Sequence, residues 1–135
     1  MIPYGKHHID EEDIQAVVDV LEGGLITQGP AIEVFEKKVA DYVGAKFAIA
    51  VSSGSAALHL SALAAGVGPG TSLVTSPITF VATANAGLHA DGNVIFVDID
   101  TETVNISIDA LGNVLDKNKS IKVIVPVHFA GLPCD

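Results

Sequence analysis

Small and polar residues gather at one point of the chain that could bind an anion. The sequence reads Ser52-Ser53-Gly54-Ser55-Ala56 between a short apolar run and an alanine-rich stretch. A strand followed by a helix would place this turn at the carboxyl end of the strand, where parallel α/β sheets bind ligands. Free backbone N–H groups and the helix dipole attract phosphate there, and the serines add hydroxyl donors. The same residues also suit an ordinary strand-to-helix turn with a serine cap, so both interpretations stay open.

Other candidate residues also follow apolar runs, so they could reach the same edge of a sheet. Phe80 could stack on a planar ring or simply fill the core. His128 could contact a cofactor or could have a purely structural role. Asp98 and Asp100 could hold a divalent metal with a nucleotide-sugar, but the ease with which aspartate enters turns favours a turn and a helix cap.

The elements that position these residues alternate along the chain. Apolar residues at helical spacing, together with capping residues, predict helices at 10–22, 30–42, 56–65, 80–89 and 108–115. Short apolar runs predict strands at 47–51, 72–76, 94–97 and 122–127. Strands joined by helices of this length form parallel βαβ units, and wholly apolar strands indicate a sheet covered on both faces. We therefore expect an α/β fold with a mostly parallel sheet of four strands and flanking helices.

The composition excludes several classes of protein. The chain has 135 residues, of which 49% are hydrophobic and 17% charged, and this composition excludes a disordered chain. Its net charge is −9 and its seven cations are all lysines, so we expect no binding to nucleic acid or to an anionic membrane surface. No apolar run is long enough to span a bilayer. A single cysteine, Cys134, and the lack of a signal-peptide pattern predict a cytoplasmic location.

Five segments, in this order and spacing, resemble the DegT-type sugar aminotransferases. They are LITQGP at 25–30, VSSGSAALHL at 51–60, PITFVATAN at 77–85, FVDID at 96–100 and PVHFAG at 126–131. Members of this family are pyridoxal-phosphate (PLP) enzymes of fold type I that aminate keto-sugars attached to a nucleotide. Segments 77–85 and 126–131 are most similar to the branch that aminates UDP-linked 4-keto-6-deoxy hexosamines for surface glycans. The resemblance covers essentially the whole chain.

The resemblance implies a role for each segment. It places one set of residues against the cofactor, where they bind the phosphate, stack on the ring or approach from a strand end. These residues are Ser53, Gly54, Ser55, Ala56, Phe80 and His128. The residues that it places in the sugar-nucleotide site are Tyr4, Leu25, Ile26 and Thr27. It further implies a nucleotide-sugar substrate, an amino donor such as glutamate and a homodimer. Residues 1–30 would form an N-terminal arm, a helix and a substrate loop.

The resemblance also implies that catalytic groups of the family have no counterpart here. None of the seven lysines lies in the context of the family's Schiff-base lysine, and the aspartate that pairs with the pyridinium nitrogen has no matching motif. We therefore expect residues 1–135 to be an incomplete N-terminal portion of the PLP-transferase major domain, inactive alone. Three alternatives remain open. They are a dehydratase of the same family with histidine in place of that lysine, a non-catalytic binding or interaction fragment, and a metal-dependent glycosyltransferase using Asp98 and Asp100.

Overall fold

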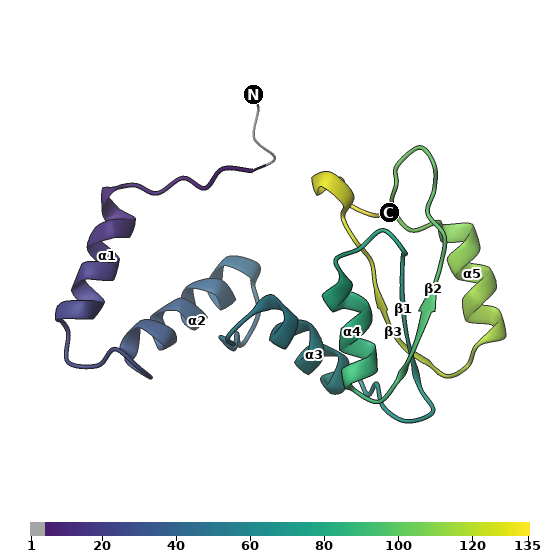
Figure 1. Cartoon of the computed structure of the whole chain (residues 1–135), viewed down its shortest axis with the longest axis horizontal. Helices are drawn as coiled ribbons and strands as arrows, with labels where there is room; N and C mark the ends of the chain where they lie inside the picture. Colours follow the sequence, from purple (N-terminus) through teal and green to yellow (C-terminus); the bar gives the residue numbers. More distant parts are fainter. Residues whose placement is uncertain (1–4) are drawn as a thin grey trace. The chain divides into compact units, whose positions relative to one another are not determined.

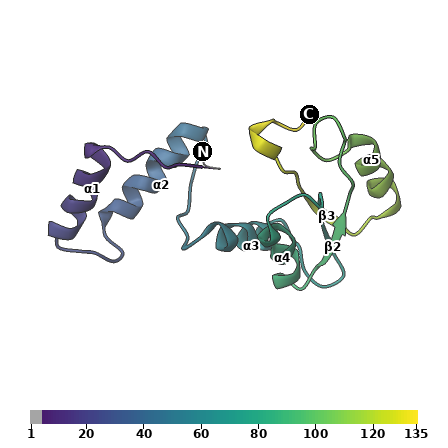
Figure 2. The same ribbon diagram turned by 45° about the horizontal axis from the view of Figure 1, so that its top comes forward.

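The computed structural model describes residues 5–135 and divides into two compact units. The first unit is Met1–Ala50 and the second is Val51–Asp135. Figure 1 and Figure 2 give two views of the chain, in which the first unit is helical and the second holds a small sheet. The expected α/β class is confirmed, and the strands that define it belong to the second unit.

Two capped helices form the first unit. α1 (Glu11–Glu22) begins at the N-cap Asp10, whose carboxylate accepts the N–H groups of Glu12 and Asp13 at 3.0 and 3.1 Å. The Asp13 side chain accepts the Asp10 N–H in return, which completes a capping box. α2 (Pro30–Val43) has proline at its first position and ends at Gly44 with a left-handed φ of 70°. Both predicted helices are confirmed to within one residue.

The second unit holds a parallel sheet of three short strands. The strands are β1 (Ser72–Thr75), β2 (Asn93–Phe96) and β3 (Ile121–Val125), in the order β2-β1-β3. Helix α3 (Gly54–Ala64) precedes β1, α4 (Val81–His89) connects β1 to β2, and α5 (Ile108–Lys117) connects β2 to β3. The short helix η1 (Phe129–Gly131) follows β3. The alternation of strands and helices therefore produces the parallel βαβ units that the sequence predicts.

Both faces of this sheet are covered, and β1 is buried over its full length. On one face, Leu73 packs with Ala62 of α3 and with Ala86 of α4. On the other face, Val74 packs with Val97 and Ile106, with residues of α5 against them. The near-continuous apolar strands follow from this double coverage.

The predicted strand at 47–51 is wrong. No strand forms there, and the side chains of Phe47 and Ile49 are 75% and 82% exposed. The Ala50 N–H donates instead to the Glu36 carboxylate at 2.7 Å. An apolar run indicates that a segment favours burial, but a strand also needs a neighbouring strand to pair its N–H and C=O groups. Within residues 5–135 no such neighbour pairs with this run, so the sheet has three strands and not four.

Candidate cofactor-binding site

The N-terminus of α3 presents unpaired backbone N–H groups at a serine-capped helix start. Ser53 adopts an extended backbone, and its Oγ accepts the Ala56 N–H at 3.2 Å. Among the residues that the structure describes, no hydrogen bond uses the N–H groups of Gly54 and Ser55. A Cβ at Gly54 would meet nothing within 4 Å, so the backbone is not crowded on that side of Gly54. The two N–H groups and the Ser55 hydroxyl can therefore donate hydrogen bonds to one phosphate group.

The local charge of this helix start also suits an anion. The first turn of α3 carries no acidic residue, whereas that of α1 carries three and that of α5 carries Asp109. An acidic side chain in the first turn would occupy the positive end of the helix dipole and repel phosphate. One expected contact is already used, because the Ala56 N–H is held by Ser53 Oγ. The donors that remain for a phosphate are thus those of Gly54 and Ser55.

Phe80 caps the start of α4, five residues beyond the last residue of β1. It is the N-cap residue, with φ −68° and ψ 137°, and its side chain is 75% exposed. Its carbonyl accepts the Thr83 N–H at 2.9 Å, and Thr79 Oγ1 donates to Thr83 Oγ1 at 2.9 Å. These bonds fix the start of the helix while the ring stays out of the core. The ring is therefore free to stack on a planar ligand.

His128 follows β3, three residues beyond Val125, the last residue of the strand. Its Nδ1 accepts the N–H of Cys134 at 3.0 Å. Because one ring nitrogen of neutral imidazole accepts and the other donates, this bond assigns the proton to Nε2. The side chain is exposed, so Nε2–H is available as a donor at the carboxyl edge of the sheet.

Asp98 and Asp100 are engaged in the turn between β2 and α5. Asp98 accepts the Ile99 N–H at 2.8 Å. The Asp100 carboxylate accepts the N–H and hydroxyl of Thr103 and the N–H of Glu102, at 2.9, 3.0 and 3.0 Å. These donors, with Thr103 first, hold the pKa of Asp100 below its ordinary value of 3.8. Among residues 5–135, no group of three or more His, Cys, Asp or Glu side chains could hold a metal ion.

The sheet places two of the predicted residues at one edge. Phe80 and His128 follow neighbouring parallel strands and share the carboxyl edge of the sheet. Helix α3 lies beside α4 (Figure 1), and its Leu58 lines one small cavity together with Val125, the last residue of β3. No paired strand precedes the phosphate-binding turn, because residues 47–51 are not part of this sheet, so its position beside Phe80 and His128 stays a prediction.

The predicted substrate residues belong to the first unit. Leu25, Ile26 and Thr27 lie in the exposed loop between α1 and α2. Gly29 closes this loop, because a Cβ there would come within 2.6 Å of the Leu25 carbonyl oxygen. Tyr4 lies outside the residues that the structure describes.

One buried polar residue near this edge carries no sequence signal. Asn105, in the connection between β2 and α5, bonds through its side chain to the segment that follows β3. Its partners are 24 to 28 residues away along the chain. Neither its residue type nor the pattern around it indicates such partners.

Parallel strands and helical crossovers define a parallel α/β protein, and the start of α3 is its candidate anion-binding site. The model of the DegT/DnrJ/EryC1/StrS aminotransferase family matches residues 7–135, and the chain belongs to this family. It is 44% identical over 134 residues to the spore coat polysaccharide biosynthesis protein SpsC of Bacillus subtilis (strain 168). That alignment covers 99% of this chain and 34% of SpsC.

Solved structures give the same assignment. The PLP form of the proposed sugar aminotransferase Spr1654 from Streptococcus pneumoniae matches with a TM-score of 0.91 and 32% identity, over 99% of this chain and 34% of that one. NtdA from Bacillus subtilis with bound PMP matches with a TM-score of 0.82 and 33% identity, over 94% of this chain and 30% of that one. The PLP and PMP forms of these neighbours support pyridoxal phosphate as the cofactor.

The matches also show how much of the relatives' length this chain covers. It spans about a third of the length of the curated relatives it matches. Among residues 5–135, the structure has no helix of the length and apolar character that a membrane crossing requires.

Proposed function

We propose that this chain supplies the phosphate-binding and ring-stacking residues of a PLP-dependent sugar aminotransferase. The observation that carries the proposal is the open start of α3, where the N–H groups of Gly54 and Ser55 have no partner within the described residues. Ser55 Oγ adds a third donor, and Ser53 shapes the turn by capping the helix. PLP, when bound, supplies an electron sink for amino-group transfer.

Each remaining site residue takes a separate task in this proposal. Phe80 covers one face of the pyridine ring, which fixes the ring plane and excludes water from that face. His128 donates from Nε2 to an acceptor on the cofactor or the substrate. Ala56 contributes to the phosphate site only if Ser53 Oγ gives up its bond to the Ala56 N–H.

The proposed substrate is a nucleotide-linked 4-keto-6-deoxy sugar, with glutamate as the amino donor. The polysaccharide-biosynthesis description of SpsC supports a role in surface glycan synthesis. Tyr4, Leu25, Ile26 and Thr27 are the proposed substrate contacts. We further propose a homodimer in the cytoplasm.

The phosphate site is tested by NMR titration of the ¹⁵N-labelled chain with inorganic phosphate, PLP and pyridoxal. Phosphate and PLP should shift the amides of Gly54 and Ser55, whereas pyridoxal, which lacks the phosphate, should leave them unchanged. The start of α5 is the matched control helix, because it has the same serine cap but carries Asp109 in its first turn. Equal shifts at both helices, or none at α3, would contradict the proposal.

The aminotransferase activity is tested in a chimera that replaces the matched third of SpsC with residues 1–135. We expect the chimera to bind PLP with a borohydride-reducible visible band and to aminate a UDP-linked 4-keto-6-deoxy hexosamine with glutamate. The same chimera with Ser55→Asp places a negative charge at the phosphate donors and should lose the band. A folded chimera that binds no PLP would refute the cofactor assignment. One that binds PLP without aminating this sugar would refute only the substrate.

A further inference from the structure

The segment that carries His128 contains a strained turn. Ala130 has a φ of 50° and Gly131 a φ of 86°, so two successive residues lie in the left-handed region. Glycine adopts this region freely, but alanine pays a steric cost there. A non-glycine residue stays in such a conformation only where the surrounding structure holds it. Something outside the turn must therefore fix it.

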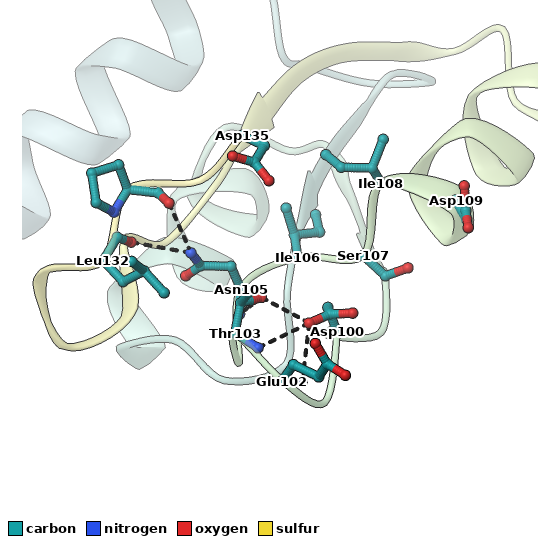
Figure 3. Close-up of a pocket in the computed structure, with 11 residues that line it drawn as sticks. Asp100, Glu102, Thr103, Asn105, Ile106, Ser107, Ile108, Asp109, Leu132 and Asp135 are labelled. Carbon is teal, nitrogen blue, oxygen red and sulfur yellow. Dashed lines mark hydrogen bonds between the residues drawn. The ribbon is translucent and has the colours of Figure 1, made fainter.

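The side chain of Asn105 supplies that restraint from both flanks of the turn. It is 5% exposed, and its Oδ1 accepts the Phe129 N–H at 3.0 Å. Its Nδ2 donates to the carbonyls of Leu132 and Pro133, both at 3.1 Å. Figure 3 shows the two carbonyl bonds, with Asn105 between the Asp100 turn and the C-terminal segment.

Asn105 is itself anchored to the connection between β2 and α5. Its carbonyl accepts the Asp100 N–H at 2.8 Å, and the adjacent Ile106 is 5% exposed in the core beneath α5. The amide orientation follows from its partners, because one N–H faces the oxygen and two carbonyls face the nitrogen. A rigid, core-anchored residue thus holds both ends of the strained turn.

The same turn determines the hydrogen bonding of the histidine. Cys134 lies directly after Pro133, and its N–H donates to His128 Nδ1 at 3.0 Å. Its Sγ donates to the Val127 carbonyl at 3.3 Å. If the Leu132 and Pro133 carbonyls were released, Cys134 would no longer be held against the ring.

We infer that Asn105 is a positioning residue that holds the strained turn so that His128 keeps its proton on Nε2 and presents it at the carboxyl edge of the sheet. The value of that donor for cofactor or substrate rests on the proposed function. The hydrogen bonding that sets the tautomer does not, because every group in it belongs to this chain.

The test compares Asn105→Ala, Asn105→Asp and the control Asn113→Ala by NMR. Asn113 bonds to the Asp109 carbonyl of its own helix, and its loss should leave the turn unchanged. The readouts are the ¹⁵N shifts of the His128 ring, which report the tautomer, and amide exchange at Phe129 and Cys134. In Asn105→Ala we expect a mixture of tautomers and exchange at both amides at least about tenfold faster.

Asn105→Asp separates the two flanks. Its carboxylate still accepts the Phe129 N–H but faces the Leu132 and Pro133 carbonyls with an oxygen in place of a donor. We therefore expect Phe129 to stay protected, while Cys134 exchanges faster and the Nε2 tautomer is lost. An unchanged tautomer in both variants would overturn the inference. Loss of protection in β1 in both variants would also overturn it, because Asn105 would then be a general folding residue.

The same samples distinguish this inference from the proposed function. Phosphate should still shift the amides of Gly54 and Ser55 in both Asn105 variants, because α3 makes no bond to the turn. If phosphate fails to shift them in the unmodified chain, the proposed function fails while the tautomer result stands. If the shifts appear but the tautomer does not respond to Asn105, only the positioning role fails.

Discussion

Gly87→Ala should destabilise the second unit although alanine is the better helix former. Gly87 lies in α4, on the side that faces the sheet. An added Cβ would come within 2.9 Å of Val94 Cγ2 and 3.2 Å of Leu73 Cβ. Val94 is β-branched and stiff at χ1, and Leu73 is 1% exposed, so neither can move away easily. Helix α4 must therefore shift outward, together with Phe80 at its N-terminus.

The size of the effect follows from two opposing contributions. Replacing glycine by alanine inside a helix stabilises it by about 1 kcal/mol. Overpacking a filled core costs about 1–3 kcal/mol. Gly112 of α5 is the matched control, since a Cβ there meets nothing within 4 Å and only the gain applies. We expect Gly112→Ala to be about 1–3 kcal/mol more stable than Gly87→Ala, which is the overpacking cost alone.

Urea unfolding followed by circular dichroism measures both variants in one experiment. The midpoint should rise for Gly112→Ala and fall for Gly87→Ala, with m-values that stay equal if only stability changes. In a melt of a domain of 60–100 residues, each kcal/mol corresponds to about 4–8 °C. If both variants are stabilised equally, the close contact of α4 with β1 and β2 is not present in solution, and the packing argument is refuted.

Three further predictions concern caps, core and charge. Ser53→Ala and Ser107→Ala should each lower the free energy of unfolding in urea by about 1 kcal/mol, because each serine caps its helix by one hydrogen bond. Only Ser53→Ala should extend the phosphate-induced NMR shifts to Ala56. Leu73→Ala should cost about 2–5 kcal/mol in the same unfolding assay, and a smaller loss would mean that the face under α3 and α4 is loosely packed. Asp100→Asn should lower the stability of the fold at neutral pH, because the ionised Asp100 carboxylate accepts bonds that hold its pKa below 3.8. The difference in stability from the unmodified chain should vanish as the pH falls through this lowered pKa. A stability difference that does not change with pH would contradict this.

The helices could be predicted from the sequence because their signals are local. Asp10 with three acidic residues after it, and Pro30 with Gly44 beyond the last turn, define helix ends within a few residues of chain. Helix α3 begins at Gly54, two residues before the predicted start, because the Ser53 cap draws Gly54 and Ser55 into the first turn. Local chemistry was thus enough for these elements.

The absence of a strand at 47–51 could not be predicted from local signals. The apolar run gives the tendency to be buried, but a strand forms only with a pairing partner, and that partner can lie anywhere in the sequence. Asn105 presents the same problem for a side chain. Its three partners become visible only when the β2–α5 connection and the segment after β3 come together in the fold.

The missing strand also changes the argument for the site. The sequence placed Ser55, Phe80 and His128 on one edge because the carboxyl ends of neighbouring parallel strands meet there. That reasoning holds for Phe80 and His128, whose strands β1 and β3 are paired. It does not hold for Ser55, since no paired strand precedes α3. The sequence argument that joins the phosphate donors to the ring-stacking face therefore has no paired strand behind it. Inorganic phosphate needs only the donors at the start of α3, so we expect changes at Phe80 or in the turn held by Asn105 to leave the phosphate-induced shifts of Gly54 and Ser55 unchanged.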